Sequence, residues 1–268
     1  MSTIAVEHDR TTSPVRATPR RIPMSRVVSV ELQKMFDTRS GFWLMASIVI
    51  TSLMATGAVI LWAPDNELTY STFAAAIGFP MAVILPMIAI LSVTSEWSQR
   101  SGLTTFTLVP HRGRVIGAKL VCAVSVGVVS MFVAMAVGAL GNLLGTAITG
   151  TPRVWDASVT DLAYIVLGNV LGLLVGFMLG VLARNSAGAI VAYFVYSLVL
   201  PPLAGLLAAT QGWFRDLQPW VDFNYAQTAL FNGAMTGTDW SHLAVAGALW
   251  LVAPLAVGLT LVMRSEVK

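Results

Sequence analysis

Charged residues are what this sequence has least of. Only 11% of its 268 residues are Asp, Glu, Lys or Arg, whereas 56% are hydrophobic, and the mean hydropathy is +0.76. Soluble domains carry about 25% charged residues, so this is the composition of a membrane protein. The net charge of +3 does not indicate nucleic-acid binding, because the basic residues sort by membrane side rather than forming one face.

Cysteine and histidine are also scarce. Cys122 is the only cysteine, which excludes an internal disulfide and a cysteine-based metal cluster. It lies in an apolar run and is predicted to pack as a small apolar residue. His8, His111 and His242 belong to different segments, so a histidine metal site is not expected. We expect neither a metal nor a cofactor.

The sequence also lacks the motifs of the common enzyme sites. It has no G-x-x-x-x-G-K-[ST] phosphate loop, no H-E-x-x-H and no G-x-S-x-G. The long apolar segments place no acid or base well inside them, which disfavours both a membrane hydrolase and a carrier coupled to an ion. The chain is therefore not expected to be an enzyme, and any transport would be driven from elsewhere.

Long apolar segments are what the sequence does have. Each of six is near or above the length of about 20 residues that crosses about 30 Å of hydrocarbon. We predict an all-α integral membrane fold with spans at about Gly41–Trp62, Tyr70–Val93, Val115–Leu140, Leu162–Leu182, Ala187–Ala208 and His242–Met263. The third span could run to about Ile148, because the segment from Leu120 to Pro152 carries no charge.

The N-terminal 40 residues differ from the rest. Residues 1–21 are rich in Thr, Pro and Arg and are predicted to be a disordered tail. Residues 22–40 have apolar side chains every three to four positions with charges off that face, which predicts an amphipathic helix on the membrane interface. Arg26 and Lys34 would reach for lipid headgroups. Residues 41–268 form the membrane domain.

The cations predict the orientation. Fourteen of the 16 Lys and Arg residues fall on one side: in the N-terminal segment, in the loop after the second span, at Arg184 and in the C-terminal tail. Cytoplasmic loops carry the excess of Lys and Arg. We therefore expect a multi-pass protein of the plasma membrane with both termini in the cytoplasm.

Two spans contain unusual residues. Glycines recur every four residues in the fourth span, at Gly168, Gly172, Gly176 and Gly180. This smooth strip would allow close approach, either by another helix of the same chain or by a second subunit. The second span holds two prolines, which predict kinks that act as hinges or only set its shape.

The segment Gln211–Ser241 before the last span is rich in aromatic residues. It is too short for two further spans and suits short re-entrant helices at the outer interface, where aromatic rings are enriched. Its aromatics would form either an anchor belt or a gate for substrate.

The polar loop Ser95–Lys119 lies between two segments that are free of charge. Glu96 and Arg100 are one helical turn apart, and an apolar insert follows them. A loop that served only to orient the chain would need only its cations, so we interpret it as a docking surface.

This loop resembles that of the permease subunits of type-2 ATP-binding-cassette (ABC) exporters. Such subunits show an acid at the end of the second span, a small residue followed by Thr, a Pro-x-Arg, and a Lys entering the third span. The matching residues are Glu96, Gly102 with Thr104 and Thr105, Pro110 with Arg112, and Lys119. The helix before the first span is similar to the family's interfacial connecting helix, and the resemblance covers about Ile22 to Lys268.

The resemblance implies a partner ATPase subunit and a second copy or paralogue of the permease, in a lipid membrane and without nucleic acid. The loop would be a coupling helix seated on the ATPase through Glu96, Arg100, Gly102, Thr104, Pro110 and Arg112, with Arg184 as a minor second contact. The second and fifth spans would line the substrate path, for which candidate residues are Phe79, Met87, Tyr193 and Phe194. Lipid contact or core packing is the alternative role of those four.

The predicted function is export of a hydrophobic or amphipathic substrate. The alternative is a membrane scaffold or assembly protein that holds a cytosolic partner through the same loop without a path between the spans. Co-purification distinguishes them, because only a permease requires an ATPase with a phosphate loop.

Overall fold

The computed structural model describes residues 22–98, 112–233 and 235–264, without the side chains of Ser40, Ser98 and Arg112. This part of the chain is helical and contains no β-strand beyond one isolated bridge, Thr69–Val154. Six helices are long and apolar enough to cross a membrane: Gly41–Trp62, Tyr70–Trp97, Gly113–Thr149, Val159–Ala183, Ser186–Thr210 and Gly237–Arg264. The prediction of six apolar spans is confirmed.

The first half of the described chain forms long, uninterrupted helices. They are α1 (Met24–Asp37), α2 (Arg39–Trp62), α3 (Tyr70–Ser98), α5 (Arg112–Thr149) and α6 (Val159–Ala183), with a short 3-10 turn at Asp65–Glu67. The helices of the second half are shorter. It comprises α7 (Ser186–Phe194), α8 (Leu200–Thr210), α9 (Gly212–Val221), α10 (Phe223–Phe231), α11 (Gly237–Gly247) and α12 (Ala253–Arg264).

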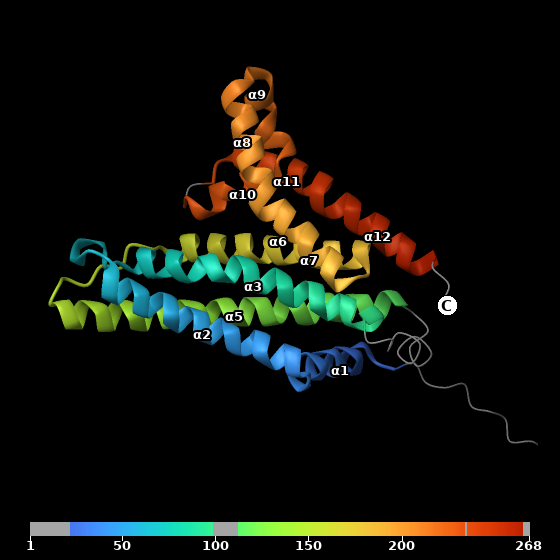
Figure 1. Cartoon of the computed structure of the whole chain (residues 1–268), viewed down its shortest axis with the longest axis horizontal. Coiled ribbons are helices and arrows are strands. Elements are labelled where there is room, and N and C mark those ends of the chain that lie inside the picture. The colour runs from blue at the N-terminus through green and yellow to red at the C-terminus, as the bar shows by residue number, and fades with distance from the viewer. Residues whose placement is uncertain (1–21, 99–111, 234, 265–268) are drawn as a thin grey trace, which may run out of the picture.

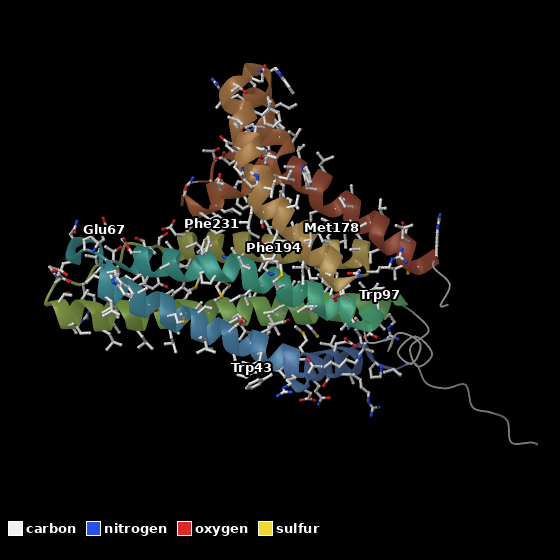
Figure 2. The ribbon with its side chains drawn as sticks, viewed as in Figure 1. Trp43, Glu67, Trp97, Met178, Phe194 and Phe231 are labelled. Atoms are coloured by element: carbon white, nitrogen blue, oxygen red, sulfur yellow. The ribbon has the colours of Figure 1, made fainter. Side chains whose placement is uncertain are left out.

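Helices α2, α3, α5 and α6 lie alongside one another, and α8 and α9 project away from them (Figure 1). Helix α1 and the last turn of α12 lie at the same end of the molecule, which we call the terminal end. Trp97 is near this end and Glu67 is at the opposite one (Figure 2). Both ends of the described chain are therefore on one side of the spans.

The third span is much longer than a bilayer needs. Its 37 residues extend for about 56 Å as an α-helix, against about 30 Å of hydrocarbon. The helix ends at Thr149, which agrees with the predicted extension toward Ile148. The helix is therefore almost twice as long as crossing the hydrocarbon requires.

Helix α3 is the centre of the packing, with Phe73, Met81 and Leu85 fully buried along its length. Glycines let the neighbouring helices close on it. A Cβ at Gly141 of α5 would lie 2.9 Å from the Phe73 ring, and one at Gly176 of α6 would lie 2.7 Å from the Pro86 carbonyl oxygen. A side chain at either glycine would push the helices apart.

The glycine strip of α6 packs within the chain. A Cβ at Gly168 would meet the ring of Phe231 in α10, and one at Gly180 would meet Ile90 of α3 at 3.4 Å. Of the two alternatives that the sequence left open, the structure supports packing inside one subunit.

The fifth and sixth spans each contain a π-helical segment just before a proline. Residues Val195–Val199 precede Pro201, and Ala248–Val252 precede Pro254. In a π-helix the carbonyl of Tyr196 would accept from the N–H of residue 201, which proline lacks. Asn224 of α10 replaces that donor, since its Nδ2 donates to the Tyr196 oxygen at 2.9 Å.

The connection after α5 is attached to the start of α3. Asp156 accepts from the Ser71 N–H at 2.8 Å and from the Ser71 hydroxyl at 2.6 Å. Partial burial would raise the pKa of Asp156, but these hydrogen bonds outweigh it and hold that pKa below its usual value. The carboxylate thus caps the start of the second span.

Two short helices, α9 and α10, occupy the aromatic segment before the last span, where short helices were expected. Their half-insertion into the membrane stays a prediction.

Candidate functional site: a charged cluster between α1, α3 and α5

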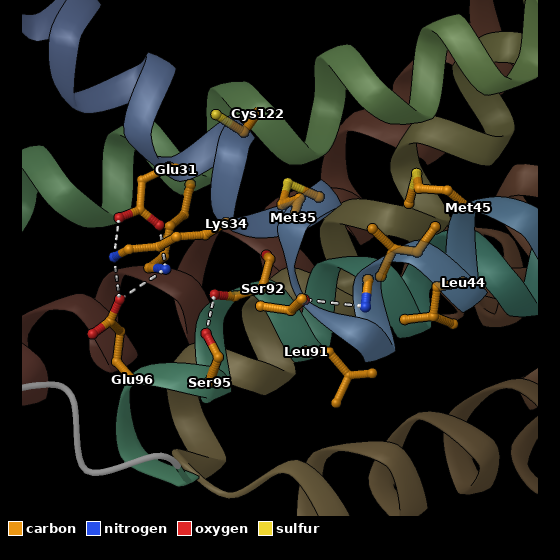
Figure 3. Close-up of a pocket in the computed structure, with 14 residues that line it drawn as sticks. Glu31, Lys34, Met35, Leu44, Met45, Leu91, Ser92, Ser95, Glu96 and Cys122 are labelled. Atoms are coloured by element: carbon orange, nitrogen blue, oxygen red, sulfur yellow. Dashed lines mark hydrogen bonds and ion pairs between the residues drawn. The ribbon is translucent and has the colours of Figure 1, made fainter.

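Four charged side chains from three helices meet at the terminal end (Figure 3). Lys34 Nζ in α1 donates to Glu31 Oε1 at 2.8 Å and to Glu96 Oε1 of α3 at 3.2 Å. Lys119 Nζ in α5 contacts Glu31 Oε2 and lies 3.1 Å from Glu96 Oε1. Each lysine therefore bridges both glutamates, in a ring of alternating charge that we call the charged cluster.

Three of the four side chains in the charged cluster are buried. Glu31, Glu96 and Lys119 are each 4% exposed, whereas the Lys34 side chain is 43% exposed. Buried charges are tolerated when they are paired and hydrogen-bonded, and removing one partner leaves the others uncompensated. The charged cluster is neutral as a set, so its stability depends on all four members.

Helix α1 places Glu31 in the cluster through its four-residue period. Val27, Glu31 and Met35 are the buried residues of this helix. The buried face of α1 tolerates the charge of Glu31 because Lys119, distant in sequence, neutralises it. Met24 and Leu32, two apolar residues of α1, are exposed.

Lys34 reaches two carboxylates instead of turning wholly to the surface. Burial favours its neutral form, but the hydrogen bond and charge of Glu31, together with Glu96, outweigh this effect and raise the pKa of Lys34 above its usual value. Lys34 is therefore a cation at every physiological pH.

A pocket of about 190 Å³ adjoins the charged cluster at the junction of α1, α2 and α3 (Figure 3). The cluster lines one side, and Leu44, Met45 and Leu91 line the other. The junction depends on Gly41, because a Cβ there would collide with the carbonyl oxygen of Met35. This glycine allows α1 and α2 to meet at close range.

The residues predicted to contact an ATPase are only partly covered by the structure. Glu96 lies in the charged cluster, paired with Lys34 and Lys119 of its own chain. The other predicted loop contacts, Arg100, Gly102, Thr104 and Pro110, lie outside the described residues. Arg112 begins α5, and its side chain is outside the description.

Arg184 is at the turn between α6 and α7. It adopts a left-handed conformation with φ of 50°, and Asn185 then caps α7 by accepting from the Gly188 N–H at 3.0 Å. This turn joins the fourth and fifth spans on the side of the chain termini, and its contact with an ATPase stays a prediction.

The four predicted substrate-path residues differ in their surroundings. Phe79 is 76% exposed on α3. Met87 packs against the apolar cluster that contains Tyr193, whose ring lies 6.3 Å from that of Phe194. Tyr193 is 5% exposed and donates to the Ala82 carbonyl at 2.7 Å. The structure joins Met87, Tyr193 and Phe194 but leaves Phe79 on the surface, and a path through them stays a prediction.

Sequence reasoning did not identify the pairing of Glu31, Lys34 and Lys119. One signal was available, since Glu31 occupies the same four-residue series as Val27 and Met35. Lys119 gives another, because it lies seven residues inside α5 and needs an acid near it. Among the described residues, no group of three or more His, Cys, Asp or Glu is placed to hold a metal ion.

These observations define the class: six helices that are long and apolar enough to cross a membrane indicate a multi-pass membrane protein. Comparison with models of known protein families and with curated proteins found no match for the chain. Function therefore rests on the residues and their geometry.

Proposed function

We propose that the chain is the permease subunit of a type-2 ABC exporter, driven by a separate ATPase that docks on residues 95–119. The observation that carries this proposal is the charged cluster. It joins α1 to α3 and α5, the two helices that lead into and out of the docking loop. A force on the loop would thus reach all three helices at once.

The packing of α3 supports transmission into the membrane. Helix α3 contacts α6 at Gly176 and α7 through the Tyr193 hydroxyl. A displacement of α3 would therefore be passed to the fourth and fifth spans. In this proposal α1 lies on the cytoplasmic interface of the plasma membrane, both termini are cytoplasmic, and α9 and α10 are half-inserted on the outer side.

The surface of the fifth span supports pairing with a second permease subunit. Leu203 and Leu206 of α8 are 56% and 64% exposed. Few residues of this span are buried against the rest of the chain. A second copy or paralogue would cover this face. The charge-free middle of the spans suits a hydrophobic or amphipathic substrate.

The proposal is tested by purifying the tagged chain from its native membrane and identifying its partners. An ATPase with a phosphate loop is expected, and recovery of other proteins alone would favour the scaffold function. In the purified complex, Glu96→Gln should lower substrate-stimulated ATP hydrolysis about tenfold, within the usual range for coupling between sites. Glu67→Gln, an exposed acid at the opposite end, is the matched control.

A further inference from the structure

A second pocket, distinct from the one beside the charged cluster, opens between α5, α6 and α12. Its volume is about 450 Å³, within the range of small-molecule sites, about 300–1,000 Å³. We call it the α5–α12 groove. Its walls are apolar except at Thr260 and Arg264, and they comprise Ile116, Leu120, Phe177, Leu255, Leu259 and Met263.

Two glycines of α5, Gly113 and Gly117, line the groove. A Cβ at Gly113 would lie 3.7 Å from Met263 Sδ, and one at Gly117 would lie 3.8 Å from Met24 Cε, so neither would clash. Both glycines line the groove and contribute no side chain to it. We expect a larger side chain at either position to reduce the volume of the groove.

The groove has a positive charge at the terminal end. Arg264, in the last turn of α12, lines it and is exposed. The described lining residues include no Asp or Glu, so the lining itself supplies no counter-charge. Arg114 follows Gly113 in α5, and its Nη2 donates to the Ile22 carbonyl at 2.6 Å, which adds a second cation to the same end of the molecule.

We propose that the α5–α12 groove binds one acyl chain of an anionic phospholipid, with Arg264 holding the phosphate. The apolar walls suit the chain, and the guanidinium suits a phosphate at the membrane surface. Basic pockets between membrane helices on the cytoplasmic side are typical sites for anionic headgroups. This binding site is separate from the charged cluster and does not depend on transport.

The test uses the purified full-length protein in detergent, with phosphatidylglycerol and phosphatidylcholine of identical acyl chains. Native mass spectrometry should show one phosphatidylglycerol retained in preference to phosphatidylcholine. Arg264→Gln should weaken phosphatidylglycerol binding about fivefold, the effect of one surface cation on an anionic lipid. Equal retention of the two lipids, or an unchanged affinity in Arg264→Gln, would overturn the assignment of the phosphate to Arg264.

A second pair of variants tests the chain-binding part. Gly117→Leu should abolish retention of the bound lipid, and Gly57→Leu, at a helical glycine with no atom within 4 Å of an added Cβ, should leave it unchanged. Thr260→Trp fills the groove from α12 and serves if Gly117→Leu does not fold. The groove would hold no phospholipid if a folded Gly117→Leu or Thr260→Trp protein retained as much lipid as the wild type. The same conclusion would follow if the wild type retained no lipid.

Discussion

The hydroxyl of Tyr193 donates a hydrogen bond to the main-chain carbonyl of Ala82 at 2.7 Å. In a regular helix this carbonyl would accept from the N–H of residue 86, but residue 86 is proline and has none. Helix α7 therefore supplies the hydrogen bond that Pro86 removes from α3. Gly176 of α6 lies against the same proline, so three spans meet at Pro86.

Tyr193→Phe should destabilise the protein by about 1–3 kcal/mol, because the Ala82 carbonyl would be left buried without a donor. Thermal unfolding in detergent, followed by tryptophan fluorescence, measures the effect. Tyr225→Phe, at a residue that is 48% exposed, should be close to neutral. Equal stability of both variants would mean that the Tyr193 bond contributes nothing.

Gly176→Ala should also destabilise the protein, by about 1–3 kcal/mol through overpacking. The added Cβ would lie 2.7 Å from the Pro86 carbonyl oxygen, which belongs to the backbone and has little freedom to move. Gly205→Ala, where no atom lies within 4 Å, is the control in the same unfolding assay. A Gly176→Ala protein as stable as the control would show that α3 and α6 can separate at low cost.

Lys119→Met should cost about 3–5 kcal/mol, because two buried carboxylates would lose their shared buried cation. In the exchange Glu31→Lys with Lys119→Glu, the pair 31–119 keeps opposite charges, so the double variant should be less destabilised than the sum of its two single changes. A double-mutant cycle of folding stability measures the coupling. Additive effects of the two single changes would contradict a direct contact between these residues.

We expect the stability of the protein to depend on pH through Asp156. Its pKa is lowered in the folded protein, so its contribution is present above the unfolded pKa of about 3.9 and is lost as pH falls through the folded value. The stabilities of the wild type and of Asp156→Asn should therefore differ near pH 6, and the difference should begin to shrink only below about pH 4. A difference that persists unchanged in strong acid would exclude the ionised carboxylate as its source.

The sequence was sufficient to place the six spans because crossing hydrocarbon depends on local length and composition. Gly41–Trp62 was placed with its observed bounds, and the charge-free run after Leu120 indicated the length of α5. The helix before the first span was also expected, from the spacing of its apolar residues. The spacing placed Glu31 in the same series as Val27 and Met35, but it did not indicate which residue neutralises its charge.

The sequence by itself thus determined a six-span helical membrane protein. Inside the hydrocarbon, the backbone N–H and C=O groups of each apolar segment must be hydrogen-bonded within its own helix. Only the tertiary structure decided which residues those helices bring together. Glu31 meets Lys119 across 88 residues, and Tyr193 meets Ala82 across 111. Such contacts depend on how whole helices tilt and pack, which no local pattern of residues encodes. The same packing leaves the α5–α12 groove open beside two glycines.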